Sequence, residues 1–100
     1  MITKRFTSPI NRDDGTRHNF IGHARSEMRL EIHPDGLAAT LQWQFEFIDG
    51  IYKGQSDRCD ITLWFDRRKR LIDFDGVYEL PVEAIEMLED NGYNAEFAKQ

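Results

Sequence analysis

Cysteine, long apolar runs and the short motifs of common enzymes are all scarce in this chain. Cys59 is the only cysteine among 100 residues, which excludes an internal disulfide and a zinc site built from several thiolates. No apolar run approaches the roughly 20 residues of a membrane-spanning helix, so we expect no membrane association. The basic N-terminus is not followed by the apolar stretch of a signal peptide, and we expect a cytoplasmic protein.

Signatures of nucleotide binding and of hydrolases are also missing. The chain contains no Gly-x-Gly-x-x-Gly, no Gly-x-x-x-x-Gly-Lys and no Gly-x-Ser-x-Gly. Among the three histidines, His18 and His23 are five residues apart, which suits metal ligands on neither a strand nor a helix, and His33 lies further on. No histidine is placed to activate Cys59, which we interpret as a buried structural thiol. These absences favour a non-catalytic protein without a cofactor or a metal.

Negative charge is concentrated in the last third of the sequence. The formal net charge is −5, yet residues 71–100 hold eight Asp or Glu against one Lys, whereas residues 1–33 hold six Lys or Arg against four acids. Nucleic-acid binding requires a basic surface, so the balance argues against a nucleic-acid partner. It is compatible with a basic protein partner.

Apolar residues recur at every second position from Glu27 to Phe74, which is the pattern of strands with one buried face. The first of these strands, residues 27–33, turns Met28, Leu30 and Ile32 inward. The expected inward residues of the following strands are Leu37, Ala39, Leu41, Trp43, Phe45 and Phe47, then Cys59, Ile61, Leu63 and Phe65, and finally Ile72 and Phe74. The pattern therefore predicts an antiparallel sheet.

Turn signals separate these strands. Pro34-Asp35-Gly36 usually closes a three-residue hairpin, but the inward residues match only across a loop of even length or with a compensating bulge. Asp49-Gly50 predicts a hairpin turn, after which Ile51–Arg58 is expected to continue as an irregular strand. The run Arg67–Arg70 predicts a tight two-residue turn that places Phe65 opposite Ile72 and Trp64 opposite Asp73.

The N-terminal part has a weaker pattern. Ile2–Phe6 is predicted to be a short edge strand, and Ser8–Thr16 carries turn signals that indicate a loop. Arg17–Ile21 is expected to pair back onto the first strand, with Gly22 marking a bend or bulge. Residues 7–24 are thus interpreted as a loop or a loose hairpin.

The C-terminal part changes period. Pro81 suits the first position of a helix of about ten residues, and Val82, Ile85 and Leu88 form an apolar stripe that must pack on the sheet. Gly92 is expected to end this helix, and Asn94 to cap one further turn over residues 95–99. The predicted fold class is α+β: one two-layer domain over residues 1–100, with a meander of four to six antiparallel strands followed by a C-terminal helix.

Trp64 departs most clearly from the pattern, because it lies on the polar face of its strand. An exposed Trp is typical of a binding anchor, while the alternative is that another element of the chain covers it. Three residues later, the basic turn is either a contact for an acidic or phosphate group or a solvated loop tip. The predicted partner-binding residues are Trp64, Arg67, Arg68, Lys69, Arg70 and Asp73.

Several carboxylates share the polar face of the predicted sheet. Clustered carboxylates can bind a divalent cation or act as an acid–base pair, but an exposed sheet face is usually charged, and no cation-binding loop motif accompanies them. The residues concerned are Glu46, Asp60, Asp66, Asp73 and Asp75.

Three functional hypotheses follow from the residues. The first is a small non-catalytic module that binds a protein partner of unknown identity through the exposed aromatic and charged face. The second is a homo-oligomer, for instance a homodimer, formed through a sheet edge or through the Trp64 face. The third is a small domain that binds a ligand, a metal or nucleic acid, or a small enzyme, using the carboxylate face or the loop that carries histidines.

Overall fold

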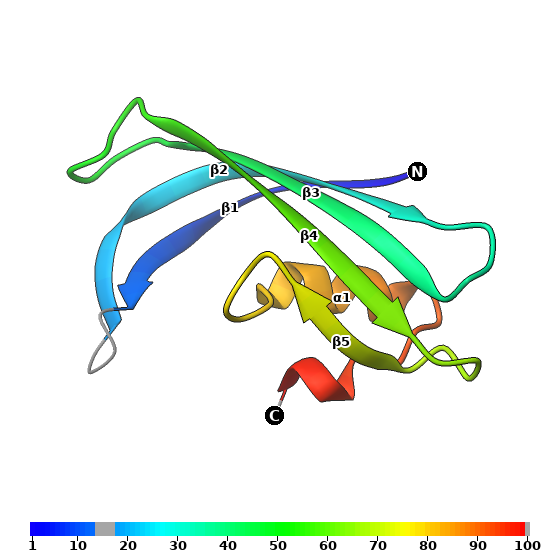
Figure 1. Cartoon of the computed structure of the whole chain (residues 1–100). Helices are drawn as coiled ribbons and strands as arrows, with labels where there is room; N and C mark the ends of the chain where they lie inside the picture. Colours follow the sequence, from blue (N-terminus) through cyan, green and yellow to red (C-terminus); the bar gives the residue numbers. More distant parts are fainter. Residues whose placement is uncertain (14–17, 100) are drawn as a thin grey trace.

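A curved five-stranded antiparallel sheet, with a helix against one of its faces, makes up the structure (Figure 1). This computed structural model describes residues 1–13 and 18–99. The strands lie side by side in chain order, β1-β2-β3-β4-β5. The elements are β1 (Ile2–Asp13), β2 (His18–Ile32), β3 (Ala38–Phe47), β4 (Ser56–Phe65), β5 (Leu71–Asp75), α1 (Val82–Asp90) and the 3-10 helix η1 (Glu96–Lys99). The predicted α+β fold, a meander followed by a C-terminal helix, is confirmed.

Apolar side chains gather on the sheet face that α1 covers, which we call the inner face. The register places Leu30 opposite Leu41, and Leu41 opposite Ile61, so the inward residues of neighbouring strands coincide. The largest fully buried side chains are Met28, Leu30, Leu41, Ile61 and Leu63 of the sheet and Leu88 of α1. Trp43 and Phe45 lie half-buried on the same face. The alternation predicted for β2, β3 and β4 is therefore confirmed, and the opposite face is the outer face.

Helix α1 begins after Pro81, which occupies the N-cap instead of the predicted first helical position. Its buried stripe consists of Ala84, Ile85, Met87 and Leu88. Val82 is 60% exposed, so its predicted place in the stripe is wrong. At 3.6 residues per turn it lies on the far side of the helix from this stripe. Gly92, with φ +84°, follows the helix end, and the Asn94 side chain accepts the Glu96 N–H at 2.9 Å to begin η1, as predicted.

The first hairpin is much longer than the sequence pattern indicates. Strand β1 continues to Asp13, so the predicted loop over Ser8–Thr16 is wrong up to that residue, and the remainder lies outside the described residues. The predicted return of Arg17–Ile21 onto the strand Ile2–Phe6 is wrong: residues 18–20 pair with Asn11–Asp13, in the extension of β1, and Ile2–Phe6 pairs with residues 26–30. The pattern was weak because Lys4, Ser8 and other polar residues alternate with apolar ones on the inner side of an edge strand.

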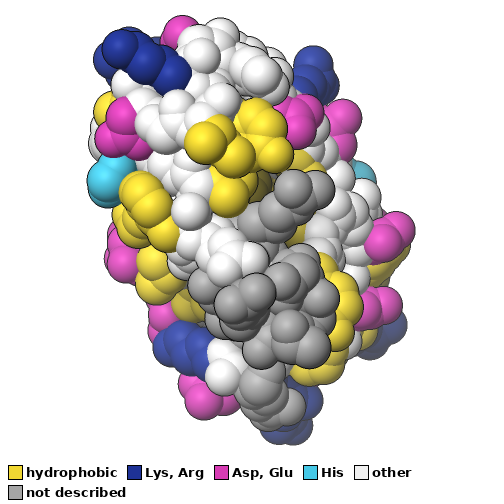
Figure 2. Space-filling model, turned by 90° about the vertical axis from the view of Figure 1, so that its left-hand side faces the viewer, with side chains coloured by type: hydrophobic (Ala, Val, Ile, Leu, Met, Phe, Trp, Pro, Cys, Tyr) yellow, Lys and Arg dark blue, Asp and Glu magenta, His cyan; other side chains and the backbone are white. Residues whose placement is uncertain are grey.

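Gly22 occupies a bulge in β2, as predicted, and the turn between β3 and β4 packs directly on it. The register of β1 and β2 shifts at this point. His23 donates its backbone N–H to Asp49 Oδ1 at 2.6 Å, and its ring Nδ1 lies 2.8 Å from Asp49 Oδ2. The backbone hydrogen bond from His23, with its side-chain bond, lowers the pKa of Asp49. This contact fixes the β3–β4 turn to β2 at the end of the molecule that faces the viewer in Figure 2. Hydrophobic patches lie between charged side chains on this end.

The loops on either side of β3 differ from expectation in part. Ile32 pairs with Ala39, and the His33 N–H donates to Ala38 O. The loop therefore consists of the four residues 34–37, and this even length keeps the inward residues of β2 and β3 opposite each other, as predicted. Leu37 belongs to this loop and is 41% exposed, so its predicted burial is wrong. The irregular strand predicted from Ile51 is also wrong before residue 56, because a series of turns leads to β4.

The last hairpin contains a bulge that the sequence pattern did not indicate. Trp64 pairs with Asp73 as predicted, but Phe65 pairs with Leu71 instead of Ile72. Leu71 is therefore buried, whereas Ile72 is 52% exposed, and the predicted inward position of Ile72 is wrong. Because the bulge adds one residue to β5, the side chains before and after that residue point to opposite faces of the sheet, whereas in a regular strand they would share one face.

Substitution of Gly50 tests the contact between the β3–β4 turn and the β2 bulge. Gly50 and Gly54 both have positive φ, of +80° and +87°, but an added Cβ would lie 2.2 Å from Ile21 O at Gly50 and in open space at Gly54. Gly54→Ala is expected to cost about 1 kcal/mol of unfolding free energy from backbone strain alone. Gly50→Ala is expected to cost at least about 2 kcal/mol more, because the backbone must also move. Urea denaturation measures both, and equal losses would contradict the close packing.

Candidate functional site

The outer face of the sheet exposes large apolar side chains near the turn that joins β4 to β5. Trp64 is 38% exposed, between Ala38 on β3 and Asp73 on β5. Ile72 lies beside Asp73 in the bulge. Leu37, in the β2–β3 loop, accepts the N–H of Phe65 at its carbonyl at 2.9 Å and so lies opposite an inner-face residue, at the exposed end of the sheet. The sequence pattern found Trp64 but missed Ile72, because it assigned Ile72 to the inner face.

The basic turn beyond β4 is organised around the carboxylate of Asp66. Its Oδ1 accepts the backbone N–H groups of Arg68 at 2.8 Å and Arg70 at 3.0 Å. Its Oδ2 accepts the Arg70 guanidinium Nε at 2.7 Å. These bonds, the backbone N–H of Arg70 foremost, lower the pKa of Asp66. The turn is thus a defined structure in which Arg70 is already paired within the fold.

Lys69 has a structural position as well. It adopts a φ of +61°, and its Nζ lies 5.6 Å from the centre of the Tyr93 ring. Its carbonyl accepts the N–H of Asn94 at 2.8 Å, so the turn is joined to the segment after α1. Of the four cations of the turn, Lys69 and Arg70 therefore contribute to the fold.

The other two cations, Arg67 and Arg68, project from the turn. Both are exposed, and neither side chain forms an ion pair or a hydrogen bond with any residue of the described ranges. A guanidinium without an internal partner is available to a carboxylate of another molecule. We call the surface formed by these residues the Trp64 surface. It consists of Trp64, Arg67, Arg68, Ile72 and Asp73.

A hollow of about 360 Å³ adjoins the Trp64 surface at the end of the sheet. It is lined by residues of the β2–β3 loop and of the basic turn, among them Leu37, Arg67 and Lys69, and by Tyr93. Tyr93 was not among the predicted site residues, because it follows α1 in sequence and is brought to the turn only by the chain's return to β5. The hollow is large enough for one side chain or a small ligand.

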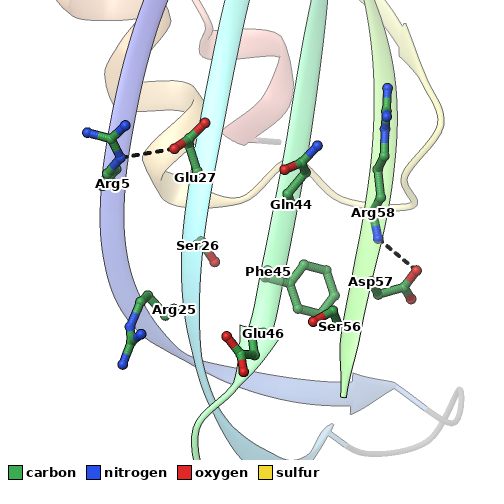
Figure 3. Close-up of a pocket in the computed structure, with 10 residues that line it drawn as sticks. All are labelled: Arg5, Arg25, Ser26, Glu27, Gln44, Phe45, Glu46, Ser56, Asp57 and Arg58. Carbon is green, nitrogen blue, oxygen red and sulfur yellow. Dashed lines mark hydrogen bonds and ion pairs between the residues drawn. The ribbon is translucent and has the colours of Figure 1, made fainter. Parts of the chain in front are cut away.

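A second hollow, of about 730 Å³, crosses the outer face nearer the β3–β4 turn (Figure 3). Arg5 Nε lies 2.9 Å from Glu27 Oε2, and Arg29 Nε lies 2.7 Å from Glu27 Oε1. These bonds, that from Arg29 foremost, lower the pKa of Glu27. Arg25 and Glu46 face each other across β2 and β3. Cations and carboxylates alternate here, so the hollow does not select a ligand of one charge.

The remaining candidate residues do not gather into a metal-binding cluster in the described part of the chain. Its His, Cys, Asp and Glu side chains nowhere gather in the threes that a metal ion would require. The outer-face carboxylates are spread along β3, β4 and β5, and Asp66 is paired within its turn. His23 is bound to Asp49, and His33 Nε2 lies 3.2 Å from Thr40 Oγ1.

Cys59 lies half-buried on the inner side of β4, as predicted. Its Sγ donates a hydrogen bond to Gly76 O at 3.2 Å. Burial, with the charges of Asp60 and Asp57, raises the pKa of this thiol. The thiolate needed for nucleophilic chemistry is therefore disfavoured.

Comparison with protein-family models, with curated proteins and with solved structures finds no match for this chain. Neither helix within residues 1–13 and 18–99 has the length and apolar content needed to cross a membrane. The interpretation of the Trp64 surface therefore rests on its own residues.

Replacement of Asp66 tests how the basic turn is held. Because folding lowers the pKa of Asp66, its ionised form stabilises the fold above the ordinary Asp pKa of about 3.9, and this contribution is lost as the pH falls through the lowered value. Asp66→Asn is expected to have a lower Tm than the wild type at neutral pH, and the difference is expected to shrink under acid conditions. Thermal melts over this pH range measure it.

Asp75→Asn is the matched control for this experiment. Asp75 is exposed on β5, and its side chain forms no hydrogen bond or ion pair with the described residues, so its replacement is expected to leave the Tm almost unchanged. A Tm difference for Asp66→Asn that stays constant from neutral to acid pH would contradict the assigned role of the carboxylate.

Proposed function

We propose that this protein is a non-catalytic interaction module that binds a protein partner through the Trp64 surface. The observation that carries the proposal is an exposed Trp beside two guanidinium groups that the fold itself does not use. Interfaces concentrate their binding energy in a few residues, and Trp and Arg are enriched among them. The apolar residues would supply the buried centre, and Arg67 and Arg68 the charged rim.

The scaffold under this surface supports the proposal. Trp64 stands on a paired strand between Ala38 and Asp73, and Asp66 fixes the turn that follows. A side chain held by a regular element loses little conformational freedom on binding, which favours affinity. The turn would therefore present Arg67 and Arg68 from a fixed position.

The charges indicate the chemistry of the partner. The cations Arg67 and Arg68 lie in the turn at one end of the surface, and the carboxylate of Asp73 belongs to β5. A complementary segment would offer an apolar side chain to Trp64 and Ile72, with carboxylates toward Arg67 and Arg68. An acidic segment interrupted by large apolar residues fits this arrangement.

A second candidate function is the binding of a small anionic ligand in the hollow beside Leu37. It is favoured by the convergence of Arg67, Lys69 and the Tyr93 ring at one cavity. A ligand bound there would raise the Tm of the wild type and not that of Arg67→Ala. A screen of anionic metabolites by thermal shift separates this function from partner binding.

Substitution at Trp64 tests the proposed function. The intact chain, immobilised and exposed to lysate of its source cell, is expected to retain a partner that can then be purified for affinity measurement. Trp64→Ala is expected to weaken binding at least about tenfold, because truncation of a central Trp commonly costs about 2 kcal/mol or more. Charge reversal by Arg67→Glu with Arg68→Glu is expected to weaken it further at low salt.

Tyr78→Ala is the matched control, since Tyr78 is an aromatic residue that is 96% exposed in the segment between β5 and α1. It is expected to bind the partner as the wild type does. If the purified partner binds Trp64→Ala with unchanged affinity, the Trp64 surface is not where it docks.

A further inference from the structure

Strand β1 leaves one long edge of the sheet without a neighbour among the described residues. It spans 12 residues and pairs on one side with β2. The opposite edge, on β5, is five residues long and is partly covered, because Arg70 forms a bridge with Asn94. Within residues 1–13 and 18–99, the β1 edge is therefore the longer and less covered of the two, and another strand could be added there (Figure 1).

The backbone groups that face this edge can be identified from the strands beyond it. Ile48 N–H donates to His23 O, so the backbone groups of His23 point toward β3 and away from β1. Pro9 lies opposite His23, and its nitrogen and carbonyl must therefore point to the open edge. Because orientation alternates, Arg5 and Thr7 also present their N–H and C=O groups there.

Two features of β1 restrict what can pair with it. Pro9 has no N–H, so one donor is missing from the open edge. Lys4 turns inward, where its Nζ lies 2.7 Å from Glu86 Oε2 of α1. Prolines and inward charges on an edge strand prevent indiscriminate pairing. A pairing that satisfies both residues is correspondingly specific.

We propose that β1 pairs antiparallel with β1 of a second copy, with Phe6 opposite the partner's Phe6 on the two-fold axis. This register places Ile2 opposite the partner's Ile10 on the inner face. Lys4 lies opposite the partner's Ser8, where no apolar side chain opposes its charge. Arg5 lies opposite the partner's Thr7, and the two exchange backbone hydrogen bonds.

Neighbouring registers that keep the inner faces together are worse. A shift of one step in one direction brings Arg5 opposite the partner's Arg5 and Lys4 opposite the partner's Phe6. A shift the other way brings Lys4 opposite the partner's Ile10 and places Arg5 against the partner's Pro9, which has no N–H to donate. The positions of Lys4 and Pro9 thus select the register centred on Phe6.

The proposed pairing forms about six backbone hydrogen bonds, two for each Arg5–Thr7 pair and one for each Thr3–Pro9 pair. The two Phe6 residues occupy a non-hydrogen-bonded position, where side chains across the axis are closest. Each Arg5 is paired with Glu27 at 2.9 Å, a carboxylate that it shares with Arg29, so the repulsion between the two arginines near the axis is reduced. The result is one continuous ten-stranded sheet with a shared inner face.

Substitution of Thr7 separates edge pairing from every other mode of association. Thr7→Pro removes an N–H that points to solvent in the monomer, so the fold should tolerate it, as it tolerates Pro9. Thr7→Ala changes the side chain and keeps the N–H. In sedimentation equilibrium the wild type and Thr7→Ala are expected at twice the 11.8 kDa chain mass, and Thr7→Pro at the chain mass.

Cysteine cross-linking tests the register without relying on a destabilised edge. In a Cys59→Ser background, Phe6→Cys is expected to form a disulfide-linked dimer on mild oxidation, because its Cα and that of the partner's residue lie within disulfide range. Ser8→Cys, four positions from the partner's equivalent residue in this register, is expected to remain unlinked.

Each possible outcome of these experiments either supports or contradicts the proposed dimer. A wild-type monomer at all concentrations would overturn the proposal and leave the edge to a strand of another protein. A dimer that persists in Thr7→Pro, with circular dichroism like that of the wild type, would assign dimerisation to another surface. Cross-linking at position 8 but not at position 6 would overturn the register. Loss of the dimer in Thr7→Pro alone, with cross-linking at position 6, supports it.

Discussion

The packing of α1 against the inner face of the sheet is the interaction on which the other features depend. Large side chains from β2, β3 and β4 are fully buried there together with Leu88 of the helix. Each contributes about 1.5–3 kcal/mol relative to exposure, which is more than any surface ion pair in the molecule can supply. This burial fixes the phase of every strand. It therefore also fixes which side chains, Trp64 among them, face outward.

Short polar contacts then set the geometry of the turns. Asp49 holds the β3–β4 turn against the bulge at Gly22, and Asp66 holds the basic turn through the backbone of Arg68 and Arg70. In both cases a carboxylate accepts backbone N–H groups that the strand ladder leaves unpaired. The same arrangement that uses Arg70 and Lys69 for structure leaves Arg67 and Arg68 free, which is why the proposed rim of the interface has two cations and not four.

The Trp64 surface and the β1 edge lie at opposite sides of one sheet and involve different strands. An apolar, charged face and an open backbone edge recognise different chemistry, since the first selects side chains and the second selects a strand. The two proposals therefore stand independently. If both hold, a dimer joined at β1 would carry two Trp64 surfaces, one at each outer end of the continuous sheet, and would bind a bivalent partner more tightly than a monomer would.

The inward residues of β2 to β4, the helix after Pro81 and the outward position of Trp64 followed from the sequence, because alternation and capping are local patterns that the buried face requires. Local patterns did not determine the length of β1, the bulge that buries Leu71 and exposes Ile72, or the loop position of Leu37. Those depend on contacts between segments distant in sequence: β1 is held by its pairing with β2, and the bulge in β5 lies next to the turn that is joined to Asn94. The pairing of Asp66 with Arg70, and with it the freedom of Arg67 and Arg68, was likewise decided by tertiary structure, because a run of four cations contains no signal for which of them the fold will use.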